Sequence, residues 1–115
     1  MDEKYAIAFD LITKAGNAKA SALLAIQAAR DYDFEKAQEL LKQADEEMVL
    51  AHHAQFELIQ NEAQGKAVDV NVILVHAQDH MAMAIMAKDN AEEFIHLYQS
   101  QQKIEEELAQ IREKI

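Results

Sequence analysis

The chain has 115 residues, half of them hydrophobic, and it contains neither cysteine nor proline. A chain of this length forms one domain with its own core, and the lack of cysteine excludes disulfides, thiolate metal sites and a cysteine nucleophile. The formal charge is −10, with 21 acidic residues against 11 Lys and Arg, which argues against nucleic acid as a partner. Because Met1-Asp2-Glu3-Lys4 begins no signal-like segment and no long apolar run follows, we expect a cytoplasmic protein.

A first helix is expected from about Asp2 to Arg30. Its apolar residues recur at helical spacing in two adjacent sets, so more than one face should be buried and the helix should contact more than one neighbour. Many of these residues are alanines, which let neighbouring backbones approach closely. The sets are Tyr5, Ala8, Ile12, Ala15, Ala22, Leu23, Ile26 and Ala29, and then Ile7, Leu11, Ala18 and Ala25.

A second helix is expected to begin at Phe34, after the turn Asp31-Tyr32-Asp33, with Asp33 as its N-cap. Gly65 is expected to end it, since glycine is common just past a helix C-terminus. Between these signals the apolar stripe keeps the helical period. It consists of Ala37, Leu40, Leu41, Ala44, Met48, Ala51, Leu58 and Ile59, with Gln55 at one position.

A third helix is expected to follow, capped by Asp69. The β-branched residues near Val68 and Val70 would also suit a strand, but a single strand has nothing to pair with. Asp89-Asn90 is expected to be a kink or short break. The end of the chain alternates spacings of four and three, as a coiled-coil seam does, through Leu97, Gln101, Ile104, Leu108, Ile111 and Ile115.

Three long helices with short connections predict an all-α fold, a three-helix bundle running up, down and up. The third helix carries polar residues within its apolar N-terminal part. At about 100° per residue, Asp79 falls at the centre of an apolar stripe, where a core is expected. His76 and His80 fall together on one flank, and Gln78 falls on the other. The stripe consists of Val72, Val75, Met83 and Met86.

Asp79 has two interpretations. An unpaired buried carboxylate is costly, and the nearest cation in the sequence is Lys88, more than one turn away. Either the helix is rotated so that Asp79 is exposed, or copies of Asp79 meet on a symmetry axis around a hard cation such as Mg²⁺.

The pair His76 and His80 has three interpretations. The residues are incidental histidines, metal ligands, or a nucleophile and its helper. Metal binding requires a third ligand on the same flank, for which the sequence offers no obvious candidate. A nucleophile requires a neutral, partly exposed imidazole close to hydrogen-bond donors.

The remaining histidines are interpreted as surface residues. His52 and His53 are adjacent in the second helix, so at least one must face solvent. The spacing Glu93-x-x-His96 occurs once, whereas di-iron bundles use it twice.

The segment Leu74-Val75-His76-Ala77-Gln78-Asp79-His80 closely resembles the active-site segment of the lactose/cellobiose-type enzyme IIA components of the sugar phosphotransferase system. Members of that family carry Val-His-Ala/Gly-Gln-Asp-His at this place. The resemblance covers about residues 5–98 and includes Ala15-Gly16-Asn17-Ala18, residues 31–37, Ala51-His52 and residues 58–65. Met81-Ala82-Met83 departs from the Leu-Met-Thr common among relatives, and the residues after about Gln99 exceed the usual family length.

This resemblance implies a phosphotransferase component that works through phosphohistidine and assembles as a nine-helix homotrimer. His76 matches the phosphorylated histidine, which takes its phosphoryl group from the histidine-containing phosphocarrier protein. It passes the group to a cysteine of the IIB component, which serves uptake of a disaccharide or β-glucoside by the membrane component IIC. Asp79 matches an aspartate that three subunits contribute to one Mg²⁺, and Gln78 and His80 match residues lining the site.

We expect residues 1–115 to form a single enzyme IIA domain, in which about residues 99–115 are an extra helical extension. We also hypothesise that Gln78 reaches a neighbouring subunit's His76 across a three-fold axis. Two other functions stay open at this point. One is a helical adaptor that binds through its heptad-like tail, and the other is a metal-storage or sensing bundle that uses His76, His80 and Asp79.

Overall fold

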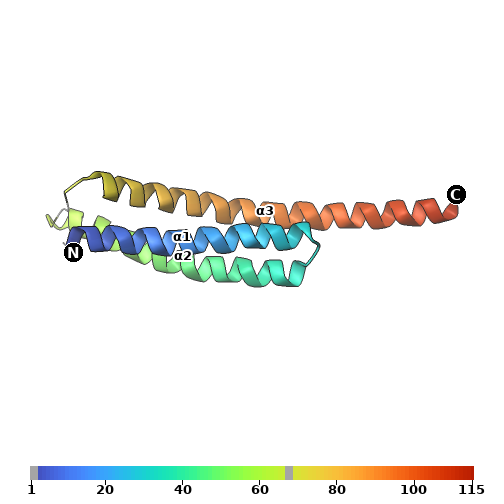
Figure 1. Ribbon diagram of the computed structural model, residues 1–115, viewed down its shortest axis with the longest axis horizontal. Helices are drawn as coiled ribbons and strands as arrows, with labels where there is room; N and C mark the ends of the chain where they lie inside the picture. The colour runs from blue at the N-terminus through green and yellow to red at the C-terminus, as the bar shows by residue number, and fades with distance from the viewer. Residues whose placement is uncertain (1–2, 67–68) are drawn as a thin grey trace.

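The computed structural model describes residues 3–66 and 69–115, which form three helices and no strand. The helices are α1 (Glu3–Arg30), α2 (Phe34–Ala63) and α3 (Val72–Lys114). Figure 1 shows the chain running along α1, returning along α2 and running forward again along α3. The predicted all-α, up-down-up bundle is therefore confirmed. The molecule is 72 Å long and about 22 Å across because α3 continues past the other two helices.

α1 is the central helix of the bundle. It packs extensively against both α2 and α3, whereas α2 and α3 contact each other much less. The prediction that the first helix has more than one neighbour is confirmed. Small side chains make this possible, because the fully buried residues of α1 are nearly all alanines and the helix backbones can approach closely. They are Ala8, Leu11, Ala15, Ala18, Ala22, Ala25 and Ala29.

The turn between α1 and α2 ends one helix and caps the next. The amide of Asp33 donates to the carbonyl of Ala28 (2.9 Å), and the amide of Tyr32 donates to that of Ala29 (2.9 Å). This is a Schellman motif, in which Tyr32 takes the left-handed position with φ of 61°. As predicted, Asp33 is the N-cap of α2, and its carboxylate accepts from the amide of Lys36 (3.2 Å).

The end of α2 repeats this pattern with a glycine. Gly65 has φ of 80°, and the amide of Lys66 donates to the carbonyl of Asn61 (2.8 Å). The prediction that Gly65 follows the end of the second helix is confirmed. Glycine adopts this conformation without the steric cost that a Cβ brings.

Two predictions about the third helix are wrong. Asp69 does not cap it. Asn71 is the N-cap, and its side-chain oxygen accepts from the amide of Leu74 (2.9 Å). α3 also continues through Asp89-Asn90 without a break. Ala91, next to this pair, is fully buried against the bundle.

Lys88 adds an ionic contact between α3 and α2. Its Nζ lies 2.9 Å from Asp45 Oδ1 on α2 and 3.5 Å from Glu92 Oε1 one turn along α3. The hydrogen bond to Asp45 raises the pKa of Lys88 above its ordinary value. Lys88 is thus engaged away from Asp79.

The positions at 2 and 68, which entered the helix predictions, lie outside the described residues.

Candidate functional site

The four polar residues singled out from the sequence all lie within the first three turns of α3. Because Asn71 fixes the start of the helix at Val72, His76 lies about one turn from the N-terminus. Ala77 is fully buried and Met81 is 1 % exposed, so these two side chains hold this part of α3 against the bundle. The polar side chains lie on the remaining faces of the helix.

His76 and His80 form a contacting pair. Their Nε2 atoms are 3.0 Å apart, and the rings meet edge to face at 87° with centroids 4.5 Å apart. His76 is exposed, whereas His80 is half-buried. One proton joins the two Nε2 atoms, so one imidazole donates and the other accepts.

The surroundings of His80 favour one tautomer. Its Nδ1 is buried and has no hydrogen-bond partner among the described residues. A proton on this nitrogen would be a buried donor without an acceptor, which is the rarer and costlier arrangement. With the proton on Nε2 instead, His80 donates to His76, and the Nε2 of His76 presents its lone pair.

Gln78 lies on the opposite flank, where α3 faces α2. Its Oε1 accepts a hydrogen bond from Nε2 of Gln55 on α2 (2.8 Å). The amide group of Gln78 therefore keeps its own two N–H donors for another partner. Gln55 was not recognised from the sequence as a site residue. Its only signal was a polar side chain at one position of the apolar stripe of α2.

Asp79 lies on the outer side of α3, and this corrects one expectation. The stripe on either side of Asp79 does not face the core of its own chain. Val72 is 85 % exposed, Met86 is 66 % exposed, and Asp79 is exposed as well. The core side of the helix is formed by small or flexible residues on the opposite face, namely Ala77, Met81 and Ala84. We call the outer surface the Asp79 face; it consists of Val72, Val75, Asp79, Met83 and Met86.

The described residues of one chain do not bring together the ligands for a metal site. Within the part of the chain that the structure describes, no group of three His, Cys, Asp or Glu side chains is placed to hold a metal ion. His76 and His80 have no third ligand there, and Asp79 offers one carboxylate. A hard cation that binds at Asp79 therefore requires oxygen ligands from further copies or from water.

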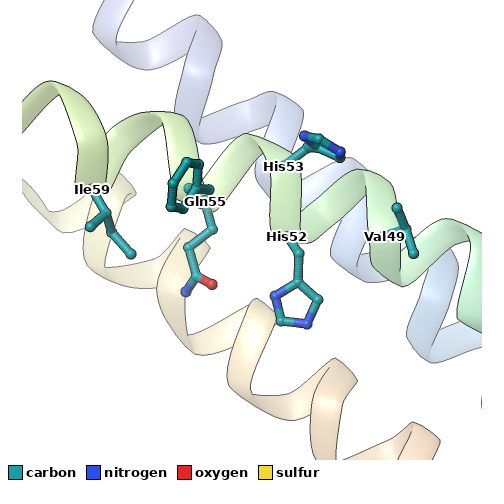
Figure 2. Close-up of a pocket in the computed structure, with 6 residues that line it drawn as sticks. Val49, His52, His53, Gln55 and Ile59 are labelled. Carbon is teal, nitrogen blue, oxygen red and sulfur yellow. The ribbon is translucent and has the colours of Figure 1, made fainter.

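A second apolar surface lies on α2. It is a shallow depression lined by Val49, His52, His53, Gln55, Phe56 and Ile59. Figure 2 shows His52 and Gln55 pointing to one side of α2 and His53 to the other. Both histidines are exposed, as is His96 on α3, so the interpretation of these three as surface residues agrees with the structure.

Comparison with known proteins shows the family to which the chain belongs. The family model described as "PTS system, Lactose/Cellobiose specific IIA subunit" matches residues 6–99. The chain belongs to this family, and it is a phosphotransferase component of a sugar-transport system.

Relatives from several bacteria agree with this assignment. The chain is 46 % identical over 98 residues to the "Lichenan-specific phosphotransferase enzyme IIA component" of Bacillus subtilis, which covers 85 % of this chain and 89 % of that protein. The crystal structure of the PTS cellobiose-specific enzyme IIA from Bacillus anthracis has a TM-score of 0.88 at 42 % identity, covering 90 % and 94 % of the two chains.

A solved structure with lower sequence identity contains a IIA protein in complex with HPr. The IIA(chitobiose)–HPr complex of the Escherichia coli phosphotransferase system matches with a TM-score of 0.75 at 28 % identity, covering 89 % of this chain and 99 % of that one. HPr is the histidine-containing phosphocarrier protein. Among the described residues of the present chain, no helix is long and apolar enough to cross a membrane.

Proposed function

We propose that His76 is the phosphoryl acceptor of this IIA component. Its Nε2 attacks the phosphoryl group of phospho-HPr, so that a P–N bond forms here as the donor's P–N bond breaks. The observation that carries the proposal is the contact of His76 with His80, because it orients an exposed imidazole whose Nε2 accepts a hydrogen bond from His80 and becomes free to attack when that donor turns to a phosphoryl oxygen. The phosphoryl group then leaves to a cysteine thiolate of the IIB component.

His80 and Gln78 support this transfer. Phosphoryl transfer asks a protein mainly for alignment and for stabilisation of charge on the phosphoryl oxygens. His80 lies one turn away from His76. When the phosphoryl group arrives, the Nε2–H of His80 donates its hydrogen bond to a phosphoryl oxygen in place of the His76 nitrogen. Gln78 lies on the far flank of its own helix with two free N–H donors, so it serves the His76 of a neighbouring copy.

We further propose a homotrimer in which three Asp79 faces meet on the symmetry axis. The Asp79 face is apolar and exposed, and burying it removes hydrocarbon from water. Its one polar member then requires a partner, since a desolvated carboxylate is costly. One Mg²⁺ held by the three Asp79 carboxylates fits this arrangement, because Mg²⁺ prefers oxygen ligands, and it would offset most of their negative charge.

The remaining partners follow from the family. The protein works in the cytoplasm, takes phosphate from HPr and serves a IIB component linked to the membrane component IIC. The transported sugar is a disaccharide or β-glucoside, in line with the lichenan, lactose and cellobiose specificities of the relatives. The net charge of −10 argues against nucleic acid as a partner.

The test is phosphorylation in a defined mixture. The protein is incubated with phosphoenolpyruvate, enzyme I and HPr, and its intact mass is measured. Wild type should gain one phosphoryl group and His76→Ala should gain none. His96→Ala is the matched control, because His96 is an exposed histidine on the same helix. Phosphorylation of His76→Ala, or its absence in wild type, would contradict the proposal.

A further inference from the structure

α3 extends well past the rest of the molecule. Residues 100–115 follow the last residue matched by the family model, and Figure 1 shows them projecting beyond the α1–α2 turn. The first part of this segment still lies beside Tyr32 of that turn, where desolvation and the neighbouring Glu105 carboxylate raise the pKa of the phenol. From Lys103 to Ile115 every residue is exposed.

The projecting helix is not polar all round. Ile104 and Ile111 are each 56 % exposed, Leu108 is 49 % exposed and Ile115 is fully exposed. A free helix of about 12 residues is marginal in water, because its own hydrogen bonds barely offset the cost of nucleation. These side chains therefore require a partner. We call this row the C-terminal seam; it consists of Leu97, Gln101, Ile104, Leu108, Ile111 and Ile115.

The C-terminal seam is the continuation of the Asp79 face. Leu97 follows Asp79 by 18 residues, which is five full turns at about 3.6 residues per turn, so both point in the same direction. The other seam positions fall within about 40° of that direction. Copies that meet through Asp79 by rotational symmetry around an axis along α3 place these tails parallel and side by side.

The residue types of the seam suit more than two strands. In heptad terms Gln101, Leu108 and Ile115 occupy a positions, and Leu97, Ile104 and Ile111 occupy d positions. Leucine at a with isoleucine at d favours trimers and tetramers over dimers. The flanking charges agree with a parallel arrangement, since Glu107 at g faces Arg112 at e of the next chain.

We propose that residues 100–115 of three copies form a parallel three-stranded coiled coil that extends the trimer interface. The proposal rests on the trimer proposed above. Leu108 lies about 48 Å along α3 from His76, so the coiled coil fastens the assembly at the end away from the phosphoryl-transfer site. The tail then changes the stability of the trimer, and it does not take part in the chemistry of a site within the assembled trimer.

The first experiment compares two variants of the full chain. Leu108→Glu with Ile111→Glu places two charges in the seam, and Ala109→Glu with Gln110→Glu places the same two charges outside it. Each variant is diluted and its mass is followed by analytical ultracentrifugation. The seam variant should dissociate at a protein concentration at least ~100-fold higher than wild type, because apolar contacts are lost in every chain. The control variant should follow wild type.

The second experiment reports the geometry of the tail directly. The chain has no native cysteine, so Leu108→Cys can form a disulfide only with another copy. Parallel tails bring the three Cys side chains together, and oxidation should yield covalent dimers, whereas Gln110→Cys on the outside should yield few. This result does not depend on the folding of a charged variant.

The outcomes separate this proposal from the proposed function. The coiled coil is overturned if wild type, the seam variant and the control variant dissociate at the same concentration. It is also overturned if the two cysteine variants cross-link equally. The C-terminal seam would then bind a different partner. If wild type is monomeric, both the coiled coil and the proposed trimer are wrong. Phosphorylation of His76 is measured in the same samples, and its loss in wild type would overturn the proposed function alone.

Discussion

Replacement of His80 by alanine is the sharpest test of how the site works. The structure places the Nε2 of His80 3.0 Å from the Nε2 of His76, within reach of a phosphoryl group bound there. His80→Ala removes a donor to a charged group, and such hydrogen bonds contribute about 1.5–3 kcal/mol. At about 1.4 kcal/mol per tenfold change in rate, phosphoryl transfer from phospho-HPr to His76 should slow by about 10- to 150-fold.

The measurement is the single-turnover rate of phosphorylation in a rapid-quench experiment with phospho-HPr in excess. His80→Gln is the matched variant, because its side-chain amide restores an N–H donor one turn from His76, and it should recover part of the rate. Urea unfolding of both variants shows whether the bundle is intact. A rate for His80→Ala within twofold of wild type would mean that His80 only packs against His76.

Three further predictions concern residues near the site. Gln78→Ala should slow transfer by about 10- to 150-fold, the effect of one hydrogen bond to a charged group, without dissociating the trimer; an unchanged rate would count against the role of Gln78. Asp79→Leu should lose bound Mg²⁺ in elemental analysis and stay trimeric, because apolar side chains can replace a desolvated charge cluster; monomers in size exclusion would refute this. Met81→Ala should reduce the free energy of unfolding by about 2–5 kcal/mol, and a urea midpoint close to wild type would show that Met81 is not a core residue.

One helix carries both the proposed chemistry and the proposed assembly. His76 and Asp79 are three residues apart on α3, so the imidazole lies on the flank of the surface through which copies would meet. Any shift of α3 about the symmetry axis moves the phosphoryl acceptor with it. The site is therefore expected to lose activity when the trimer dissociates, since Gln78 of the neighbour is lost at the same time.

The sequence by itself determined the helices and most of their ends. Ala, Leu, Glu, Lys and Gln dominate a chain without proline, and such a composition has few alternatives to helix. Asp33 and Gly65 act through local backbone bonds, and local signals of this kind can be read without knowing the fold. The segment around His76 was recognisable for a related reason, since its polar residues stand out within an apolar helix.

Only the tertiary structure decided which side of α3 faces the core. Hydrophobicity favours the row of Val72, Val75, Met83 and Met86, yet the bundle buries the Ala77 and Ala84 side. The physical reason is distance, because α1 presents mainly alanines and the helices pack so closely that most of the side chains between them are small, with Met81 the large exception on α3. The larger apolar residues are left outside. The bond between Gln55 and Gln78 was equally invisible in the sequence, because it joins two helices whose relative rotation is set by this packing.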